Sequence, residues 1–265
     1  MKHTFYLLLS VLILTSCSHK MIRLNPLDTS ARDEEGFRVV KQLNDSVKVV
    51  TSFENTYRRR DGGQWKEYYV FDTEITNISE RELEIRPRDF GGMALDNRKE
   101  QLPTQRADGT LVFASARALD PDEEVTLIPQ RMAAAERRLR ANKVLNTVLF
   151  VGLAVAEVSN ESNHRQSFHE YATKSATMSA GWQALAVKRV ADRQQFANQI
   201  DQLHWERATF GQETFRRMIL KPGEAMRGKL LIEADRSAAF FRFNYPVLNP
   251  SISFLFEQHL VSPGK

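Results

Sequence analysis

The sequence has 265 residues, of which 37 are Lys or Arg and 33 are Asp or Glu, giving a formal net charge of +4 at pH 7. A composition of 42% hydrophobic and 26% charged residues is typical of a globular protein and excludes a wholly disordered chain. The small charge excess argues against nucleic acid as a partner, because nucleic-acid-binding surfaces need clustered positive charge.

The first residues have the three parts of a secretory signal peptide. Lys2 supplies a positive start, residues 5–14 are apolar, and Leu14 begins the sequence Leu-Thr-Ser-Cys that ends at Cys17. These last four residues resemble the lipobox of bacterial lipoproteins. The resemblance implies that residues 1–16 are removed as a lipoprotein signal peptide and that Cys17 becomes an N-terminus acylated with fatty acids such as palmitate.

Two other interpretations of Cys17 are a free thiol and the end of a transmembrane anchor. The apolar run before it is shorter than the roughly 20 residues that a spanning helix needs. Cys17 is the only cysteine of the chain, and a lone free thiol is a hazard in the oxidising compartment that an exported protein reaches. Both observations favour acylation.

The residues after Cys17 indicate where a lipid-anchored chain would reside. Ser18 stands where lipoproteins retained at the inner membrane of enterobacteria carry Asp, and no acidic residue follows within residues 18–21. By resemblance to known lipoproteins, we expect anchoring in the bacterial cell envelope, at the outer membrane and facing the periplasm. Residues 17–35 are polar and turn-rich, which predicts a lipidated tether.

Residues 36–129 show the pattern of short strands and predict the first part of a β-sandwich. Tyr69, Phe71, Thr73 and Ile75 alternate with polar residues, as expected of a strand with one buried face. The chain also predicts strands at residues 47–52, 83–85, 90–95, 110–114 and 125–128, the last after an Asp-Pro-Asp turn.

Residues 130–204 change to a helical period. They contain no proline and many alanines, and apolar residues recur at helical spacing. The pattern predicts helices at residues 130–159 and 164–204 joined by a turn at residues 160–163, which together form a long αα-hairpin.

Residues 205–265 return to the strand pattern. Pro222 and Gly223 predict a type II turn, and further strands are expected at residues 228–233, 240–245 and 252–256. Short strands on both sides of a helical block favour a mainly β fold with an α insertion, a two-layer β-sandwich interrupted by the hairpin.

Three stretches resemble immunoglobulin-like sandwiches of uncharacterised bacterial envelope proteins. These stretches are Glu-Ile-Thr-Asn-Ile-Ser at residues 74–79, the Pro-containing strand at residues 83–90, and Leu-Lys-Pro-Gly-Glu at residues 220–224 before Gly228. The resemblance implies an immunoglobulin-like fold and an extracytoplasmic setting. It implies no catalytic residues, and the helical hairpin departs from the plain pattern of these domains.

The residue pattern gives no indication of catalysis, a metal site or a cofactor. His164, His169 and Glu170 are the only tight group of possible metal ligands, and two helical residues five apart point about 140° away from each other. The chain lacks a Gly-x-Ser-x-Gly nucleophile motif, a second thiol and a glycine-rich phosphate loop. We therefore expect neither an enzyme nor a metal or cofactor protein.

Two surface features are candidates for interaction. Arg58, Arg59 and Arg60 beside the turn at residues 61–63 form either a basic tip for lipid phosphates or a solvated charge cluster. Residues 144–158 are apolar nearly all round. At about 20 Å as a helix this run is too short to cross a membrane.

The apolar run, with Val148, Phe150 and Val151 at its centre, has two possible roles. It is either buried between the second helix and the sandwich, or a docking surface for a membrane or a partner. Trp182, Leu185 and Val187 on the second helix offer a matching apolar surface, which favours burial.

These observations favour a non-enzymatic envelope lipoprotein that acts as a protein-interaction or assembly module through its sandwich and hairpin. Its expected partners are the membrane, through the N-terminal lipid, and an envelope protein. The alternative is a carrier of lipids or small molecules with a pocket lined by Phe150, Trp182 and Phe196. An enzyme would need ionisable groups brought together by the fold.

Overall fold

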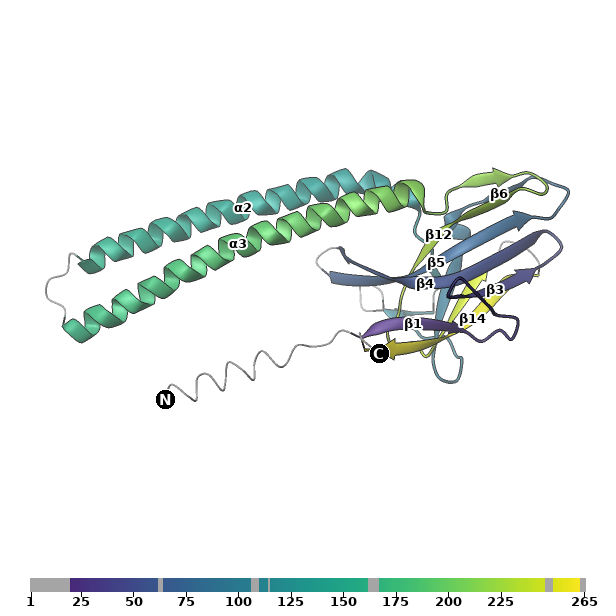
Figure 1. The fold of residues 1–265 in the computed structure, drawn as a ribbon, viewed down its shortest axis with the longest axis horizontal. Coiled ribbons are helices and arrows are strands. Elements are labelled where there is room, and N and C mark those ends of the chain that lie inside the picture. Colours follow the sequence, from purple (N-terminus) through teal and green to yellow (C-terminus); the bar gives the residue numbers. More distant parts are fainter. Residues whose placement is uncertain are drawn as a thin grey trace. The chain divides into compact units, whose positions relative to one another are not determined.

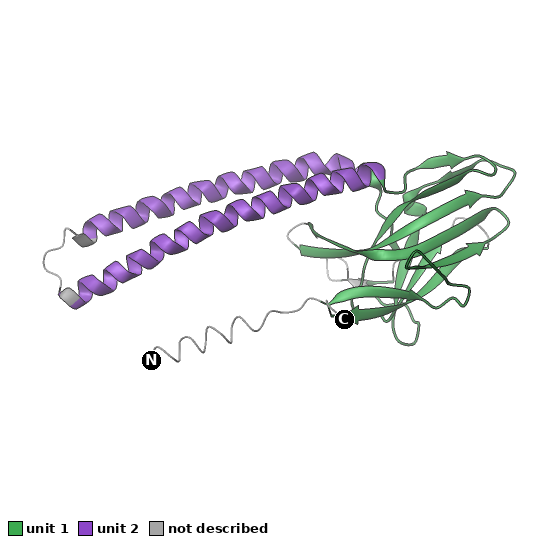
Figure 2. Ribbon diagram, viewed as in Figure 1, with its two compact units in different colours: residues 1–121, 213–265 green, residues 122–212 purple. Residues whose placement is uncertain are grey.

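The computed structural model describes residues 20–61, 64–105, 110–113, 115–161, 167–245 and 250–262. The chain divides into two compact units (Figure 2). Unit 1 comprises residues 1–121 and 213–265, and unit 2 comprises residues 122–212. Strands and helices each account for 39% of the described residues, so the β-sheets are accompanied by a large helical part.

Figure 1 shows the elements in chain order. Unit 2 contains the long helices α2 (Pro121–Glu161) and α3 (Phe168–Gln212). Unit 1 contains a short helix, η1 (Pro87–Asp89), and the strands. The strands are β1 (Met21–Pro26), β2 (Arg32–Glu34), β3 (Phe37–Leu43), β4 (Val47–Asp61), β5 (Gln64–Asn77), β6 (Leu83–Ile85), β7 (Gly91–Leu95), β8 (Thr104–Gln105), β9 (Leu111–Val112), β10 (Ala116–Arg117), β11 (Met218–Leu220), β12 (Ala225–Glu233), β13 (Phe240–Tyr245) and β14 (Ile252–Val261).

Two antiparallel five-stranded sheets form the body of unit 1. Their strand orders are β1-β14-β13-β7-β10 and β12-β5-β4-β3-β2, and two small sheets join β11 to β6 and β8 to β9. The longest pairing is between β4 and β5, where Asp61 lies opposite Gln64. Residues 62–63 of the predicted turn lie outside the described residues.

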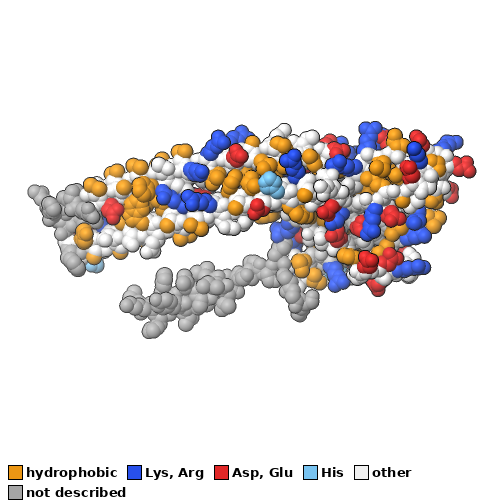
Figure 3. All heavy atoms as spheres, turned by 45° about the horizontal axis from the view of Figure 1, so that its top comes forward, with side chains coloured by type: hydrophobic (Ala, Val, Ile, Leu, Met, Phe, Trp, Pro, Cys, Tyr) orange, Lys and Arg blue, Asp and Glu red, His pale blue; other side chains and the backbone are white. Residues whose placement is uncertain are grey.

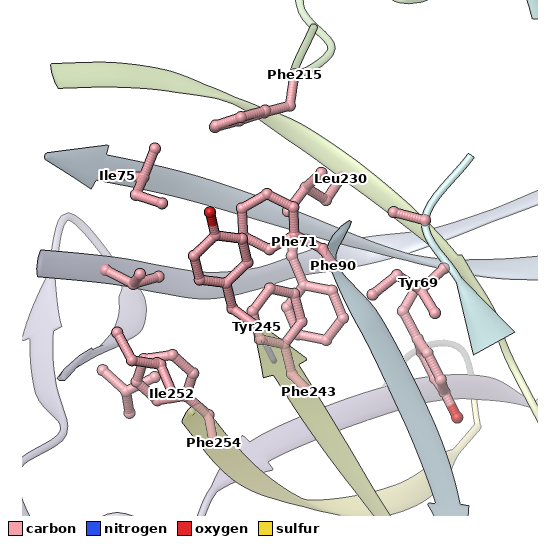
Figure 4. Close-up of a cluster of buried hydrophobic side chains, with 14 of the residues drawn as sticks. Tyr69, Phe71, Ile75, Phe90, Phe215, Leu230, Phe243, Tyr245, Ile252 and Phe254 are labelled. Carbon is pink, nitrogen blue, oxygen red and sulfur yellow. The ribbon is translucent and has the colours of Figure 1, made fainter. Parts of the chain in front are cut away.

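An aromatic core lies between the two large sheets (Figure 4). Tyr69, Phe71, Thr73 and Ile75 on β5 are all buried, which confirms the predicted alternation. The Phe71 ring lies 5.0 Å from the ring of Phe243 on β13. It also lies 5.3 Å from Phe256 on β14, so one side chain contacts two strands of the opposite sheet.

The expected tether at residues 17–35 is wrong from Met21 onward. β1 pairs antiparallel with β14 along its whole length, and Ile22 and Leu24 are each only 4% exposed. Arg23, which lies between them, is exposed, so β1 is a strand with one buried face set in an otherwise polar stretch. β2 follows within the same stretch and pairs with β3.

The predicted strand at residues 125–128 is also wrong, because these residues belong to α2. Pro121 opens the helix, and Asp122, Glu123 and Glu124 occupy its first turn. Proline and acidic residues are favoured at a helix N-terminus, where free N–H groups and the helix dipole stabilise negative charge. The helical unit is therefore longer at both ends than the predicted residues 130–204.

The segments that lead into and out of unit 2 both bind the outer edge of β12. The Leu119 N–H donates to the Leu231 carbonyl over 2.8 Å, and the Phe215 N–H donates to the Lys229 carbonyl over 2.9 Å. These bonds satisfy a strand edge that would otherwise expose unpaired backbone groups. The chain thus leaves unit 1 and returns to it at the same strand.

We predict that Phe71→Ala destabilises the protein by about 3–5 kcal/mol, because it removes a ring from the centre of the core. Urea unfolding followed by near-ultraviolet circular dichroism measures the loss. Ile219→Ala is the control, since the Ile219 side chain is 58% exposed and its truncation should change stability by about 0.5 kcal/mol or less. A similar small loss for Phe71→Ala would contradict the shared core.

Candidate functional site

The helices α2 and α3 lie side by side and run in opposite directions (Figure 1). Arg131, early in α2, pairs with Glu206, late in α3, over 3.2 Å. Phe150 and Trp182, nearer the other ends, meet edge to face with ring centroids 5.1 Å apart. The Leu153 side chain packs against Gly181, where a side chain would not fit: a Cβ at Gly181 would lie only 2.8 Å from Leu153 Cδ2, which is too close for two carbon atoms.

A polar network fixes the alignment of the two helices. The Asp192 carboxylate on α3 accepts hydrogen bonds from Asn142 (3.2 Å) and Asn146 (2.9 Å) on α2. Lys188, one turn earlier on α3, donates to the same carboxylate over 2.7 Å. The bonds from Lys188 and Asn146 hold the pKa of Asp192 below its usual range. Polar groups that pair across a helix interface favour one register over the alternatives.

A row of exposed valines occupies the side of α2 that faces away from α3. Val144, Val148, Val151, Val155 and Val158 are spaced alternately four and three residues apart, so they share one face of the helix. Their exposed fractions lie between 53% and 66%. We call these five valines the outer face of α2.

The prediction that residues 144–158 are buried is therefore wrong. By length and composition, α2 is the one helix among the described residues that is apolar enough to cross a membrane. Only 6% of its most apolar window is buried. The physical reason is geometric: a helix that is apolar nearly all round needs neighbours on several sides, and α3 covers one side.

Arginines continue the outer face toward the start of α2. Arg137 and Arg140 precede Val144 by seven and four residues and therefore lie in line with the valines. Arg140 forms an exposed ion pair with Glu136 over 3.4 Å. Arg137 and Arg138 are exposed and form no ion pair with any residue that the structure describes. Figure 3 shows hydrophobic side chains along the helical unit with Lys and Arg side chains beside them.

The predicted interaction residues on α2 separate into two sides. Val148 and Val151 belong to the outer face, whereas Phe150 packs against Trp182 and lies 5.4 Å beneath the Arg189 guanidinium. The Trp182 indole N–H also donates to Glu157 over 3.1 Å. Because Phe150 and Trp182 contact each other, these two rings hold the helices together rather than lining a ligand pocket.

The three predicted arginines of β4 do not form one basic surface. Arg59 is 3% exposed, and its guanidinium lies 5.0 Å from the centre of the Tyr68 ring. Arg58 and Arg60 are exposed on the opposite face of the strand, with Arg58 over the Trp65 ring. Alternation along a strand separates consecutive side chains in this way.

Unit 1 has an open cleft of about 590 Å³. Its lining includes Arg86, Arg88 and Arg117 together with Asp89 and Asn244. Arg86 pairs with Glu84 over 2.6 Å and Arg88 pairs with Asp120 over 3.6 Å, so acidic neighbours balance two of the three arginines. The cleft is a weaker candidate than the outer face, because it lacks a concentrated charge and a buried polar group to orient a ligand.

No group of metal-ligating side chains occurs among the described residues. Cys17 and His164 lie outside the described residues. Comparisons of the chain with protein-family models, curated proteins and solved structures find no match. Function is therefore inferred from the geometry and chemistry of this chain.

We predict that acid weakens the helix pair through Asp192. Because the folded state lowers the pKa of Asp192, its stabilisation is complete above the ordinary aspartate range near about 4 and is lost as the pH falls through the folded value. The Asp192→Asn variant should have a lower melting temperature at pH 7 than the unaltered protein. It should also lose less stability than the unaltered protein when the pH is lowered. Far-ultraviolet circular dichroism measures both. Equal acid sensitivity of the two proteins would contradict the role of the carboxylate.

Proposed function

We propose that this protein is a non-enzymatic, lipid-anchored protein of the bacterial envelope that acts as an interaction or assembly module. In this proposal unit 1 is an immunoglobulin-like β-sandwich, and α2 and α3 form an αα-hairpin that binds another component of the envelope. The sequence favours a protein as that component.

The outer face of α2 carries this proposal. Its five valines are more than half exposed, and they form one continuous row on a long helix. Soluble proteins rarely leave large contiguous apolar patches in water, and such patches mark sites of association. The polar network at Asp192 already joins α2 to α3, so the outer face is not needed to hold the helix pair together.

The architecture of unit 1 supports the sandwich assignment. Two antiparallel sheets share an aromatic core, and residues alternate between buried and exposed along β13 and β14. This is the arrangement expected of two-layer β-sandwiches. The chain leaves and re-enters unit 1 beside β12, so both connections to the helical unit lie at one edge strand.

The start of β1 supports close anchoring. Only residues 18–20 separate Cys17 from Met21, so an acylated Cys17 would keep β1 within about 14 Å of the lipid.

Cys17→Ser should release the protein from the membrane fraction of its host, because acyl chains supply the anchoring free energy. Cell fractionation with immunodetection measures the release. An unchanged membrane-bound share would contradict lipid anchoring at Cys17.

Crosslinking in intact cells tests the module itself. The full chain is compared with a variant in which residues 122–212 are replaced by a short Gly-Ser linker. This linker is feasible because Leu119 and Phe215 both bind β12. We expect a specific envelope component, sought among proteins and lipids, to be lost with the helical unit. Recovery of the same components from both chains would contradict the proposal.

A further inference from the structure

We propose that the outer face of α2 binds the surface of a membrane that contains anionic lipids, with α2 lying in the plane of the interface. This inference rests on the proposed function and names what the helical unit contacts. Three observations lead to it: the width of the apolar face, its length, and the arginines at one end.

The apolar surface is wider than the row of valines. Leu145 and Leu149 are 48% and 43% exposed and lie beside the row. Gly152 is open to solvent, with nothing within 4 Å of an added Cβ. No charged residue occurs from Val144 to Ala156, and Glu157 points to Trp182 on α3. An uncharged apolar surface over about half of a helix is typical of helices that lie in a membrane interface.

The length of the surface favours lying in the plane over crossing the membrane. Val144 to Val158 spans about 21 Å at 1.5 Å per residue, whereas the hydrocarbon layer is about 30 Å thick. The opposite side of α2 binds Asp192 and Glu206 on α3, through Asn142, Asn146 and Arg131. With α2 in the interface, α3 and this polar side stay toward water.

The arginines supply charge complementarity to lipid phosphates. Arg137 and Arg140 lie in line with the valines, and Arg138 lies about 100° from Arg137 on the flank that also holds Leu145 and Leu149. All three are exposed. A basic residue near an anionic membrane surface increases binding about fivefold at moderate salt. The same helix face therefore presents an apolar patch and, directly before it, the cations that a phosphate layer attracts.

A second copy of the chain is a poorer occupant of this face. In a parallel α2 pair, Arg137 and Arg140 would lie against the same arginines of the second copy. The valine row covers only two heptads, whereas a stable coiled coil is recognised over at least three or four. A lipid surface avoids both problems. Its phosphates attract the arginines, and its acyl chains need no matching row of side chains.

The experiment uses the chain from Ser18 onward, which keeps every described residue and contains no cysteine. Binding is measured by cosedimentation with vesicles of phosphatidylethanolamine and phosphatidylglycerol, and with vesicles of phosphatidylcholine alone. The test variant combines Val148→Asp with Val155→Asp. The matched control combines Val187→Asp with Val190→Asp, because these α3 valines are 69% and 68% exposed and point away from α2.

We expect binding to the anionic vesicles, its loss in the outer-face variant, and no change in the control. Arg137→Gln combined with Arg138→Gln should weaken binding roughly 30-fold, without threatening the fold, because two exposed cations are removed. Binding of the unaltered chain should also fall as salt rises. A fluorophore attached through Val151→Cys should shift to the blue on binding, and one attached through Val187→Cys should not.

Three results would overturn the inference. If the chain does not bind vesicles but self-associates or crosslinks to a protein through Val151→Cys, the lipid assignment fails and the interaction module stands. If vesicle binding is absent and removal of residues 122–212 leaves the cellular crosslinks unchanged, both proposals fail. Equal binding by the outer-face variant and the control also rejects the lipid assignment.

Discussion

The structure of unit 2 depends on one imbalance: residues 144–158 of α2 are apolar nearly all round, and α3 covers only one side of this segment. The covered side is joined to α3 by the Phe150–Trp182 contact and by the hydrogen bonds to Asp192. The uncovered side leaves five valines in water. Burying these valine side chains against a partner would contribute about 25 cal/mol of stabilisation for each Å² of apolar surface removed from water. This imbalance is the physical reason to expect a binding partner.

Unit 1 explains how such an insertion is tolerated. Its core is made by aromatic side chains that meet between two sheets, with Phe71 at the centre. None of those sheets is interrupted by the helices, because the chain leaves and returns along the outer edge of β12. Those two segments belong to unit 1 and cover the outer edge of β12, which protects this edge from pairing with other chains.

The sequence predicts those parts of the fold that local periodicity controls. The buried faces of β5 and β13 follow from alternation within a single strand. The sequence does not predict β1, because this strand forms by pairing with β14 at the other end of the chain and local periodicity does not reveal such a partner. The predicted strand at the start of α2 is wrong because proline after aspartate is common both in turns and at helix N-termini.

The candidate site was predictable only in part. The apolar character of residues 144–158 is visible in the sequence, but whether α3 covers that run depends on which side of α2 carries Asn142 and Asn146. The separation of Phe150 from Val148 and Val151 likewise needs the position of Trp182. Arg59 shows the same limit, since one strand turns it inward between two exposed arginines.

The central claim is that the outer face of α2 is covered in the native envelope. It is tested most directly by the reactivity of single cysteines, at Val151→Cys or Val187→Cys, toward a water-soluble maleimide in isolated envelopes. On the proposed acylation Cys17 has no free thiol. The account predicts that the cysteine at position 187 is labelled and that the one at position 151 is protected until detergent is added. Equal labelling of both positions in native envelopes would contradict it.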